Sequence, residues 1–221
     1  MTRGCLITLE GGEGAGKSTQ GRLLSARLSA LGHAVTVTRE PGGSAGAEAI
    51  RGVLLDPTLD GFDAMTQALL FAAARRDHIR ARIAPALAAG GVVISDRFYD
   101  STRAYQGARG GISAARIRLL ERMAVGRLKP DLTLMLDLPV AEGLRRAALR
   151  HGQALSSSDT FERRSHGFHE AVRQRFLAIA ADEPERCAVI DASGDAETVF
   201  AALMAVVDQR LPRLMTPRGP A

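Results

Sequence analysis

Residues 11–18 constrain this chain most, because they match the pattern G-x-x-x-x-G-K-[ST] at every fixed position. An apolar run of strand length, residues 5–9, precedes them, and apolar residues at helical spacing follow them up to Gly32. A strand, a glycine-rich turn and a helix let backbone N–H groups point inward while the helix N-terminus adds partial positive charge. The motif therefore predicts a loop that binds the phosphates of a nucleoside triphosphate. The alternative is a glycine-rich turn with a chance Lys-Ser pair.

Each residue type in this loop has a physical role. Lys17 can reach the β- and γ-phosphates, and the hydroxyl of Ser18 can ligate Mg²⁺. We expect the bound nucleotide to contact the whole run, which consists of Gly11, Gly12, Glu13, Gly14, Ala15, Gly16, Lys17, Ser18 and Thr19.

Length and composition indicate a single domain. The 221 residues, 46% of them apolar, suffice for one α/β domain, which we place at residues 1–211. Residues 212–221 hold three of the nine prolines, and we expect them to be disordered. Cys5 and Cys187 lack metal-ligand spacing and read as small core residues. Without a signal peptide or membrane-spanning stretch, we expect a soluble, cytoplasmic protein.

The formal charge is +5, and nearly all basic residues are arginines, since lysine occurs only at positions 17 and 129. Arginine clamps phosphates bidentately, so the surplus suits a substrate with several phosphates. Globally we favour a composition bias in which arginine replaces lysine on the surface. The basic residues are dispersed, with two tyrosines and no tryptophan for base stacking. We therefore expect no nucleic-acid partner.

Strand and helix patterns alternate along the chain, which predicts an α/β fold with five parallel strands and helices on both faces. The expected strands are residues 5–9, 34–38, 91–96, 131–137 and 187–191. The expected helices are residues 17–31, 45–55, 63–89 with a kink or boundary near Pro85, 114–128, 140–150, 161–181 and 196–211.

Two strand ends carry charged residues, and ligands bind at this edge of open parallel sheets. Asp96 ends a buried strand and can hold the water shell of a metal ion, while Arg97 follows it and can clamp a second phosphate. The turn at residues 39–43 places further charges at the same edge. Its Glu40–Pro41 bond can be cis or trans.

Two further groups could form a pocket for a base. Phe71 and Arg75 are four residues apart in a predicted helix, so they share a face that suits a pyrimidine. Spacing alone favours an ordinary core phenylalanine and a solvated arginine. A second group gathers hydroxyl and amide groups that can read a base edge or ribose, with a solvated loop as an equal alternative. This group consists of Ser101, Thr102, Tyr105 and Gln106.

Arginines flank a polar segment without periodicity, residues 151–160. They are Arg145, Arg146 and Arg150 before it, and Arg163 and Arg164 after it. This pattern favours a short mobile lid, about residues 145–164, that closes over the triphosphate and excludes water. The alternative is a solvated surface.

Taken together, these motifs resemble the bacterial thymidylate kinases over nearly the whole chain. The motifs are residues 9–19, the Thr-Arg-Glu-Pro-Gly-Gly run at 38–43, residues 71–75, 96–98, 101–102, 104–107, 129–133 and 168–170. The phosphate loop is shared with many NTPases, whereas the runs at 38–43 and 96–107 are far more specific. The resemblance implies a P-loop kinase of the nucleoside monophosphate type that forms dTDP and ADP from dTMP and ATP for dTTP synthesis. It also implies Mg²⁺ and a homodimer.

The resemblance further implies site roles by position. Lys17, Ser18 and Asp96 hold ATP phosphates and Mg²⁺, Glu13 approaches the acceptor, and Arg97 grips the dTMP phosphate. The expected dTMP contacts are Glu13, Arg39, Pro41, Phe71, Arg75, Arg97, Ser101, Thr102, Tyr105 and Gln106. In that set Phe71 stacks on thymine, Arg75 bonds its carbonyl, Thr102 and Gln106 read the base edge, and Tyr105 packs near the 2′ carbon.

The lid departs from the family pattern. The phosphate loop carries no arginine, which implies catalytic lid arginines instead. However, this chain reads Asp-Thr-Phe-Glu at 159–162 where such members usually have Asp-Arg-Phe-Glu. The candidates for the transition-state arginine are Arg150, Arg163, Arg145 and Arg146; we assign Arg150 to catalysis and Arg145 and Arg146 to ATP. Glu162 joins Ser18 and Asp96 as an expected metal ligand.

Two other functions compete with this interpretation. One is a kinase for a different nucleoside monophosphate or small hydroxyl substrate. The other is a regulatory GTPase or ATP-driven partner protein, but the chain contains no asparagine and therefore lacks the Asn-Lys-x-Asp segment that usually reads guanine.

Overall fold

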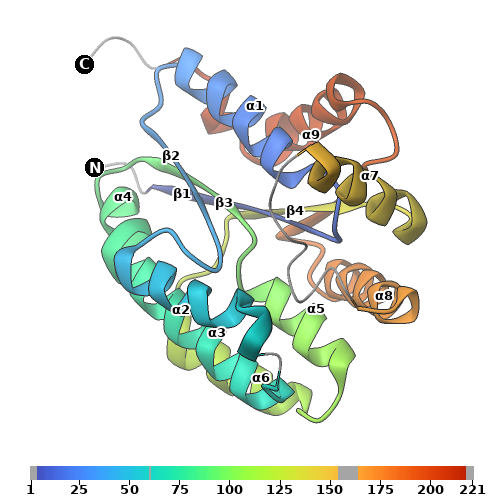
Figure 1. Ribbon diagram of the computed structural model, residues 1–221. Helices are drawn as coiled ribbons and strands as arrows, with labels where there is room; N and C mark the ends of the chain where they lie inside the picture. The colour runs from blue at the N-terminus through green and yellow to red at the C-terminus, as the bar shows by residue number, and fades with distance from the viewer. Residues whose placement is uncertain (1–3, 60, 154–163, 218–221) are drawn as a thin grey trace.

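A five-stranded parallel sheet forms the centre of the protein. The computed structural model describes residues 4–59, 61–153 and 164–217 (Figure 1). The strand order is β2-β3-β1-β4-β5, which confirms the predicted parallel α/β fold. The strands are β1 (Cys5–Gly11), β2 (Val35–Arg39), β3 (Val92–Asp96), β4 (Leu132–Asp137) and β5 (Cys187–Asp191).

Strand β1 lies in the middle, paired with β3 on one side and β4 on the other. All seven of its residues are buried, as expected for a central parallel strand with helices on both faces. Its register sets Leu9 opposite Asp96 of β3, so the start of the phosphate loop lies beside the end of β3. This pairing brings two predicted parts of the site together.

The helices cover both faces of the sheet (Figure 1). Helices α1 and α9 pack with one face around Leu9, Leu24 and Leu203, and helices α3 to α6 and α8 lie on the other. The helices are α1 (Lys17–Ala30), α2 (Ala45–Leu55), α3 (Ala64–His78), α4 (Ala84–Ala88), α5 (Tyr99–Arg109), α6 (Ala114–Val125), α7 (Val140–Gln153), α8 (His166–Asp182) and α9 (Ala196–Arg210). Among the described residues, none of these helices has the length and apolarity to cross a membrane.

The predicted long helix at 63–89 is divided earlier than expected. A π-helical turn, Ile79–Ile83, separates α3 from α4, and the Ala84 N–H bonds the Ile79 carbonyl. Pro85 lies in the first turn of α4, where its missing N–H costs little. Its ring would clash with a carbonyl of the preceding α-helical turn, and the wider π turn relieves this crowding.

Three other boundaries differ from the sequence predictions. The residues treated as a possible loop around 101–106 belong to α5. Helix α8 begins at His166, after the N-cap Ser165, rather than at 161. Disorder from residue 212 is wrong for the first residues, because Pro212–Leu214 forms a 3₁₀ turn and the Leu214 carbonyl bonds the ring of buried His33 at 2.9 Å. Burial of Leu214 against the α1–α9 side explains this order.

A buried ion pair fixes the N-terminal half of α5. Arg186, just before β5, contacts both carboxylate oxygens of Asp100 at 2.7 and 2.9 Å. Their side chains are 6% and 0% exposed. Arg186 also donates to Thr133 on β4, and its guanidinium lies over the Tyr99 ring. This pair therefore ties the helix that carries four predicted site residues to the sheet.

We predict that Asp100→Ala lowers the free energy of unfolding by about 3 kcal/mol or more, because it leaves the Arg186 charge buried without its main partner. Denaturant unfolding monitored by circular dichroism measures this loss. Arg80→Ala is the matched control, since Arg80 is 72% exposed in its pair with Asp77, and we expect a change within about 0.5 kcal/mol. Equal losses in both variants would contradict the assignment.

Candidate functional site

The phosphate loop links the end of β1 to the start of α1. Gly14 and Gly16 have positive φ angles of 68° and 87°. A Cβ atom on Gly14 would also collide with the carbonyl oxygen of Gly143 in α7, so only glycine fits there. The Lys17 Nζ folds back to the carbonyls of Gly11 at 3.1 Å and Gly12 at 2.7 Å. The loop thus surrounds an ammonium group where phosphates would bind.

Ser18 and Asp96 meet at the edge of this loop. The Ser18 hydroxyl donates to the Asp96 carboxylate at 2.6 Å, although the two residues are 78 positions apart. Mg²⁺ prefers such oxygen ligands together with phosphate oxygens and water. The donor set of this pair fits Mg²⁺, whereas the described residues contain no cluster of three or more His, Cys, Asp or Glu that could hold a metal alone.

Arg97 directly follows β3 in a left-handed backbone conformation, with φ of 70°. Its guanidinium donates to the Glu13 carboxylate at 2.9 Å, the Gly11 carbonyl at 3.2 Å and the Ser101 hydroxyl at 3.2 Å. It also lies 5.0 Å from the centre of the Tyr105 ring. A non-glycine residue rarely adopts this backbone conformation, so the surrounding contacts must hold it there.

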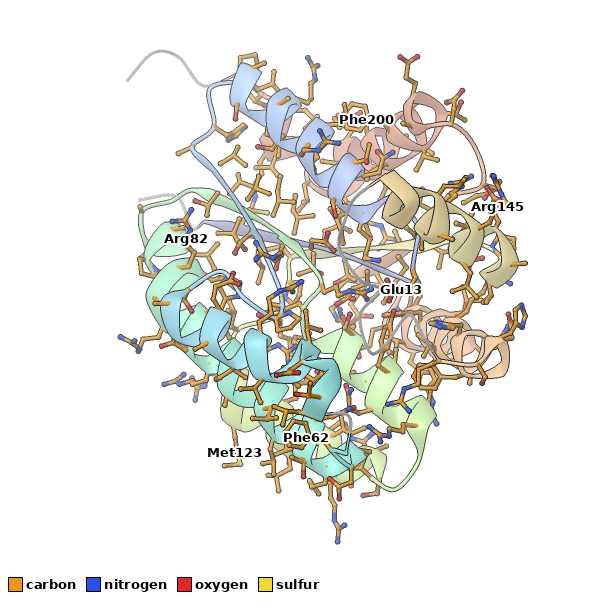
Figure 2. All side chains as sticks on the ribbon, viewed as in Figure 1. Glu13, Phe62, Arg82, Met123, Arg145 and Phe200 are labelled. Carbon is orange, nitrogen blue, oxygen red and sulfur yellow. The ribbon has the colours of Figure 1, made fainter. Side chains whose placement is uncertain are left out.

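Glu13 joins the phosphate loop to α5 and β3. Besides Arg97, it accepts a hydrogen bond from the Tyr105 hydroxyl at 2.6 Å. Burial opposes ionisation of Glu13, but Arg97, Lys17 and Tyr105 outweigh it and lower the pKa to about 2. Figure 2 shows Glu13 near the centre of the view, and 14% of its side chain is exposed. It therefore stays a carboxylate at neutral pH.

Burial and the nearby Arg97 charge lower the pKa of Lys17 to about 8, against the opposing effect of Glu13, Asp96 and Glu10. Two cations, Lys17 and Arg97, therefore lie close together in a buried part of the site. An anion with several charges would relieve their repulsion. The site is electrostatically prepared for phosphates.

Two cavities meet at this point. The first has a volume of about 220 Å³ and follows the phosphate loop. The second has a volume of about 130 Å³ and lies between α2, α3 and α5. Glu13, Glu40, Arg51 and Arg97 line both. The first cavity is also lined by Gly14, Ala15, Gly16, Lys17, Ser18, Thr19, Arg39 and Asp96, and the second by Pro41, Leu55, Phe71, Arg75, Phe98, Ser101, Thr102, Tyr105 and Gln106. The shared wall allows two ligands to meet end to end.

Arg75 is buried rather than solvated, with 3% of its side chain exposed. It donates to Glu40 at 2.7 Å, Thr102 at 3.2 Å and the Phe98 carbonyl at 3.0 Å. A guanidinium has five N–H donors, so these three bonds leave donors for a ligand in the second cavity. Of the two interpretations of residues 71 and 75, the structure favours a pocket, because both side chains line it.

Glu40 supports Arg75 through a chain of buried groups. Its second carboxylate oxygen contacts His78 at 3.0 Å, and His78 is hydrogen-bonded to Thr38 at 2.6 Å. The Glu40–Pro41 peptide bond is cis. Arg39, by contrast, is 54% exposed and pairs with Glu48 at 3.0 Å, at the phosphate-loop cavity rather than the second one.

The predicted ATP contacts of the lid arginines are not assembled here. Arg145 and Arg146 both bond Glu142, and Arg146 also donates to the carbonyls of Ala192 and Ser193. Neither lines the two cavities described above. Figure 2 shows Arg145 on the outer side of α7, where 61% of its side chain is exposed. The Arg150 side chain, Arg163 and Glu162, with most of the predicted lid, lie outside the described residues.

Sequence reasoning missed several functional residues. Arg51 lies in a helix whose pattern gave no signal, yet it lines both cavities and donates to the Pro41 carbonyl at 2.8 Å. Glu40 lies in the predicted turn at residues 39–43 and Glu142 in the predicted helix at 140–150, and neither pattern marks the residue as part of a site. Glu10 was seen only as part of a motif, although a carboxylate ending an apolar strand is itself an unusual signal.

Glu10 is fully buried beneath the start of α5. One carboxylate oxygen accepts from the backbone N–H groups of Phe98 at 2.7 Å and Ser101 at 3.3 Å. The other contacts the Ser101 hydroxyl at 2.6 Å. Burial, aided by Asp100, raises the pKa of Glu10 to about 8, although Ser101, Arg97 and Phe98 favour the charged form.

The sequence and the fold of this chain are similar to those of thymidylate kinases. The thymidylate kinase family model matches residues 9–203. The thymidylate kinase of Caulobacter vibrioides is 54% identical over 211 residues, covering 96% of this chain and 99% of the relative. That of Rhodopseudomonas palustris is 53% identical over 212 residues, covering 95% and 90%. The crystal structure of thymidylate kinase from Ehrlichia chaffeensis matches with a TM-score of 0.75 and 32% identity, covering 93% of this chain and 99% of that one.

The raised pKa of Glu10 predicts a specific pH dependence of stability. Between its ordinary pKa of 4.5 and about 8, the folded state binds a proton that the unfolded chain has released. The free energy of unfolding should therefore fall as pH rises through this range, relative to Glu10→Gln, which carries no such proton. Denaturant titrations of both proteins at pH 5, 6, 7 and 8 measure the difference. Parallel curves would contradict the raised pKa.

Proposed function

This chain belongs to the thymidylate kinase family, whose members phosphorylate dTMP, and we propose that its two joined cavities align ATP and dTMP for that transfer. The reaction is ATP + dTMP → ADP + dTDP, a step of dTTP synthesis. The single observation that supports this arrangement best is the shared wall of the cavities, formed by Glu13, Glu40, Arg51 and Arg97. Phosphoryl transfer depends mainly on such in-line positioning and on neutralising charge.

On the donor side, the phosphate loop and Lys17 bind the ATP phosphates. Ser18 and Asp96, hydrogen-bonded at 2.6 Å, would hold Mg²⁺, and Glu162 would be a third ligand. When bound, Mg²⁺ neutralises charge on the β- and γ-phosphate oxygens. Lys17 already points into the loop and needs only to exchange two carbonyl contacts for phosphate oxygens.

On the acceptor side, Arg97 holds the dTMP phosphate, and its contacts with Glu13 and Ser101 fix its direction. Phe71 stacks on thymine and Arg75 donates to a base carbonyl, and Pro41 lines the same cavity. Arg39 lines the phosphate-loop cavity instead, from where it would assist Arg97 at the dTMP phosphate. Ser101, Thr102 and Gln106 complete the polar contacts from one face of α5. Tyr105, bonded to Glu13, packs near the 2′ carbon and disfavours a ribose hydroxyl.

Arg150 is the arginine that we assign to the transferring phosphoryl group. Glu142 already binds Arg145 and Arg146, and Arg146 is also hydrogen-bonded to two carbonyls, which leaves both poorly placed for this role. Arg150→Ala should then lower kcat by on the order of 10³, as for other arginine fingers, and Arg145→Ala by far less. Equal losses of kcat in Arg150→Ala and Arg145→Ala would contradict the assignment of Arg150.

A homodimer is the assembly that we propose. Helices α3 and α6, which pack together, carry the exposed apolar side chains Leu69 (49% exposed), Leu119 (49%) and Met123 (70%), and a second copy would cover them. Figure 2 shows Met123 at the outer edge of this layer. Sedimentation of the wild type and Met123→Glu tests the assembly, and a monomeric wild type would refute it. We further propose a cytoplasmic location, where ATP and nucleoside monophosphates are available.

The substrate assignment predicts a clear order of acceptors. Coupled ADP release should be faster with dTMP than with UMP, dCMP, AMP or GMP, because the base pocket combines the Phe71 ring with guanidinium and amide donors and Tyr105 disfavours a ribose hydroxyl. The rate with dUMP, which presents the same carbonyls, measures how far the 5-methyl group is recognised. Preference for a purine would leave the proposed ATP site in place but contradict the assignment of the second cavity to thymine. Absence of turnover with every acceptor would favour a nucleotide-binding partner protein.

Arg97→Ala is predicted to raise the KM for dTMP at least about 10-fold, because a charged, partly buried clamp on a phosphate is lost. The KM for ATP should change much less, since Lys17 and the loop remain. Steady-state kinetics with each substrate varied in turn measures both values. Arg80→Ala, a change at an exposed residue outside the cavities, serves as the control. An unchanged KM for dTMP would show that Arg97 is not the clamp.

A further inference from the structure

We propose that Glu10 is a positioning residue for the acceptor phosphate, because its buried carboxyl group holds the backbone that aims Arg97. This inference rests on the proposed role of Arg97 as the dTMP clamp. Glu10 itself is fully buried and does not line either cavity, so it acts only through its neighbours.

The first observation is that Glu10 caps α5 from another element. The N-cap residue of α5, Phe98, has no side-chain cap of its own. Instead, Glu10 accepts from the N–H of Phe98 and from the N–H of Ser101, the third residue of the helix. In a capping box, two residues of the helix share these bonds. Here a single carboxyl group from β1 makes both, and so ties the start of α5 to the central strand.

The second observation is that Arg97 immediately precedes this cap. Its left-handed φ of 70° needs external support, and the N–H of the next residue is bonded to Glu10 at 2.7 Å. On the other side, the Arg97 N–H bonds the Leu9 carbonyl at 2.9 Å. Residues 9 and 10 of β1 therefore hold the peptide groups on both sides of the Arg97 side chain.

The third observation is a side-chain link to the same guanidinium. The Ser101 hydroxyl contacts Glu10 at 2.6 Å and accepts from Arg97 at 3.2 Å. Glu10 thus directs Arg97 twice, through the backbone and through Ser101. A role in folding alone would need the helix cap but not this second link.

Side chains alternate along β1, so Glu10 lies on the opposite face of the strand from Leu9. Leu9 faces the α1–α9 layer, whereas Leu6, Thr8 and Glu10 face the opposite layer, and all are fully buried. Thr8 is bonded to Thr133 of β4 at 2.8 Å, away from Arg97. The two polar residues of this face therefore offer a matched pair, Glu10 beneath Arg97 and the start of α5, and Thr8 bonded to the neighbouring strand β4.

The test measures dTMP binding directly by calorimetry without ATP, together with both KM values, for Glu10→Ala, Glu10→Gln and the control Thr8→Val. Glu10→Ala should weaken dTMP binding by on the order of 10-fold or more while the KM for ATP stays within about 3-fold, because a misdirected clamp loses its phosphate. Glu10→Gln should bind dTMP nearly as the wild type does, since its amide keeps the carbonyl acceptor and can donate to Ser101. Thr8→Val should lose stability without a change in dTMP affinity.

Two outcomes overturn the proposal. One is a folded Glu10→Ala with wild-type affinity for dTMP, and the other is an equal loss of affinity in Thr8→Val. Should Glu10→Ala fail to fold, Ser101→Ala tests the side-chain link. Ser101→Ala should have little further effect on dTMP affinity in a protein that already carries Arg97→Ala. Additive effects of the two substitutions would contradict the positioning role of Glu10.

The same measurements separate this inference from the proposed function. If the wild type does not bind dTMP, or if Arg97→Ala binds it as well as the wild type does, the function or the clamp is wrong whatever Glu10 does. If both behave as expected and the Glu10 variants do not, only the positioning role fails.

Discussion

The ion pair between Arg97 and Glu13 is the interaction on which the rest of the site depends. It joins the residue after β3 to the phosphate loop after β1, and both side chains lie in the wall between the two cavities. Neither group would be stable there alone, because burial penalises an isolated charge. Each also has a second anchor, the Ser101 hydroxyl for Arg97 and the Tyr105 hydroxyl for Glu13. Both cavities are therefore built around one pair of opposite charges.

Helix α5 forms one side of the cavity that this ion pair also lines. Its first turn is held by two buried carboxyl groups from different directions, Glu10 beneath its N-terminus and its own Asp100 bound to Arg186. Polar side chains on its opposite face then line the second cavity. A helix pinned in this way can present several donors without the looseness of a loop, which suits recognition of a base. Apolar packing therefore holds α5 against the sheet, and the contacts of Glu10 and Asp100 fix the orientation of its first turn.

A second network of buried polar side chains supports the cavity between α2, α3 and α5. Glu40 holds Arg75 on one side and His78 on the other, and His78 in turn contacts Thr38 at the end of β2. Arg75, Glu40, His78 and Thr38 are each hydrogen-bonded within this network, as burial requires. Arg75 reaches the cavity with its direction already set. Little ordering remains to be done when a ligand binds, and this favours affinity.

The sequence by itself determined the phosphate loop, the five parallel strands and the strand-end position of Asp96 and Arg97. Glycine spacing, apolar runs and the geometry of parallel sheets are local or periodic signals, so a single chain displays them. It also brought Phe71 and Arg75 to one helical face. Only the tertiary structure decided that Glu10 bonds the backbone next to Arg97, that Glu40 and Arg51 line both cavities, that residues 99–109 form a helix, and that Glu142 holds Arg145 and Arg146. These facts depend on pairings between residues far apart in the chain, and on burial that makes an unpaired charge too costly, neither of which leaves a periodic trace in the sequence.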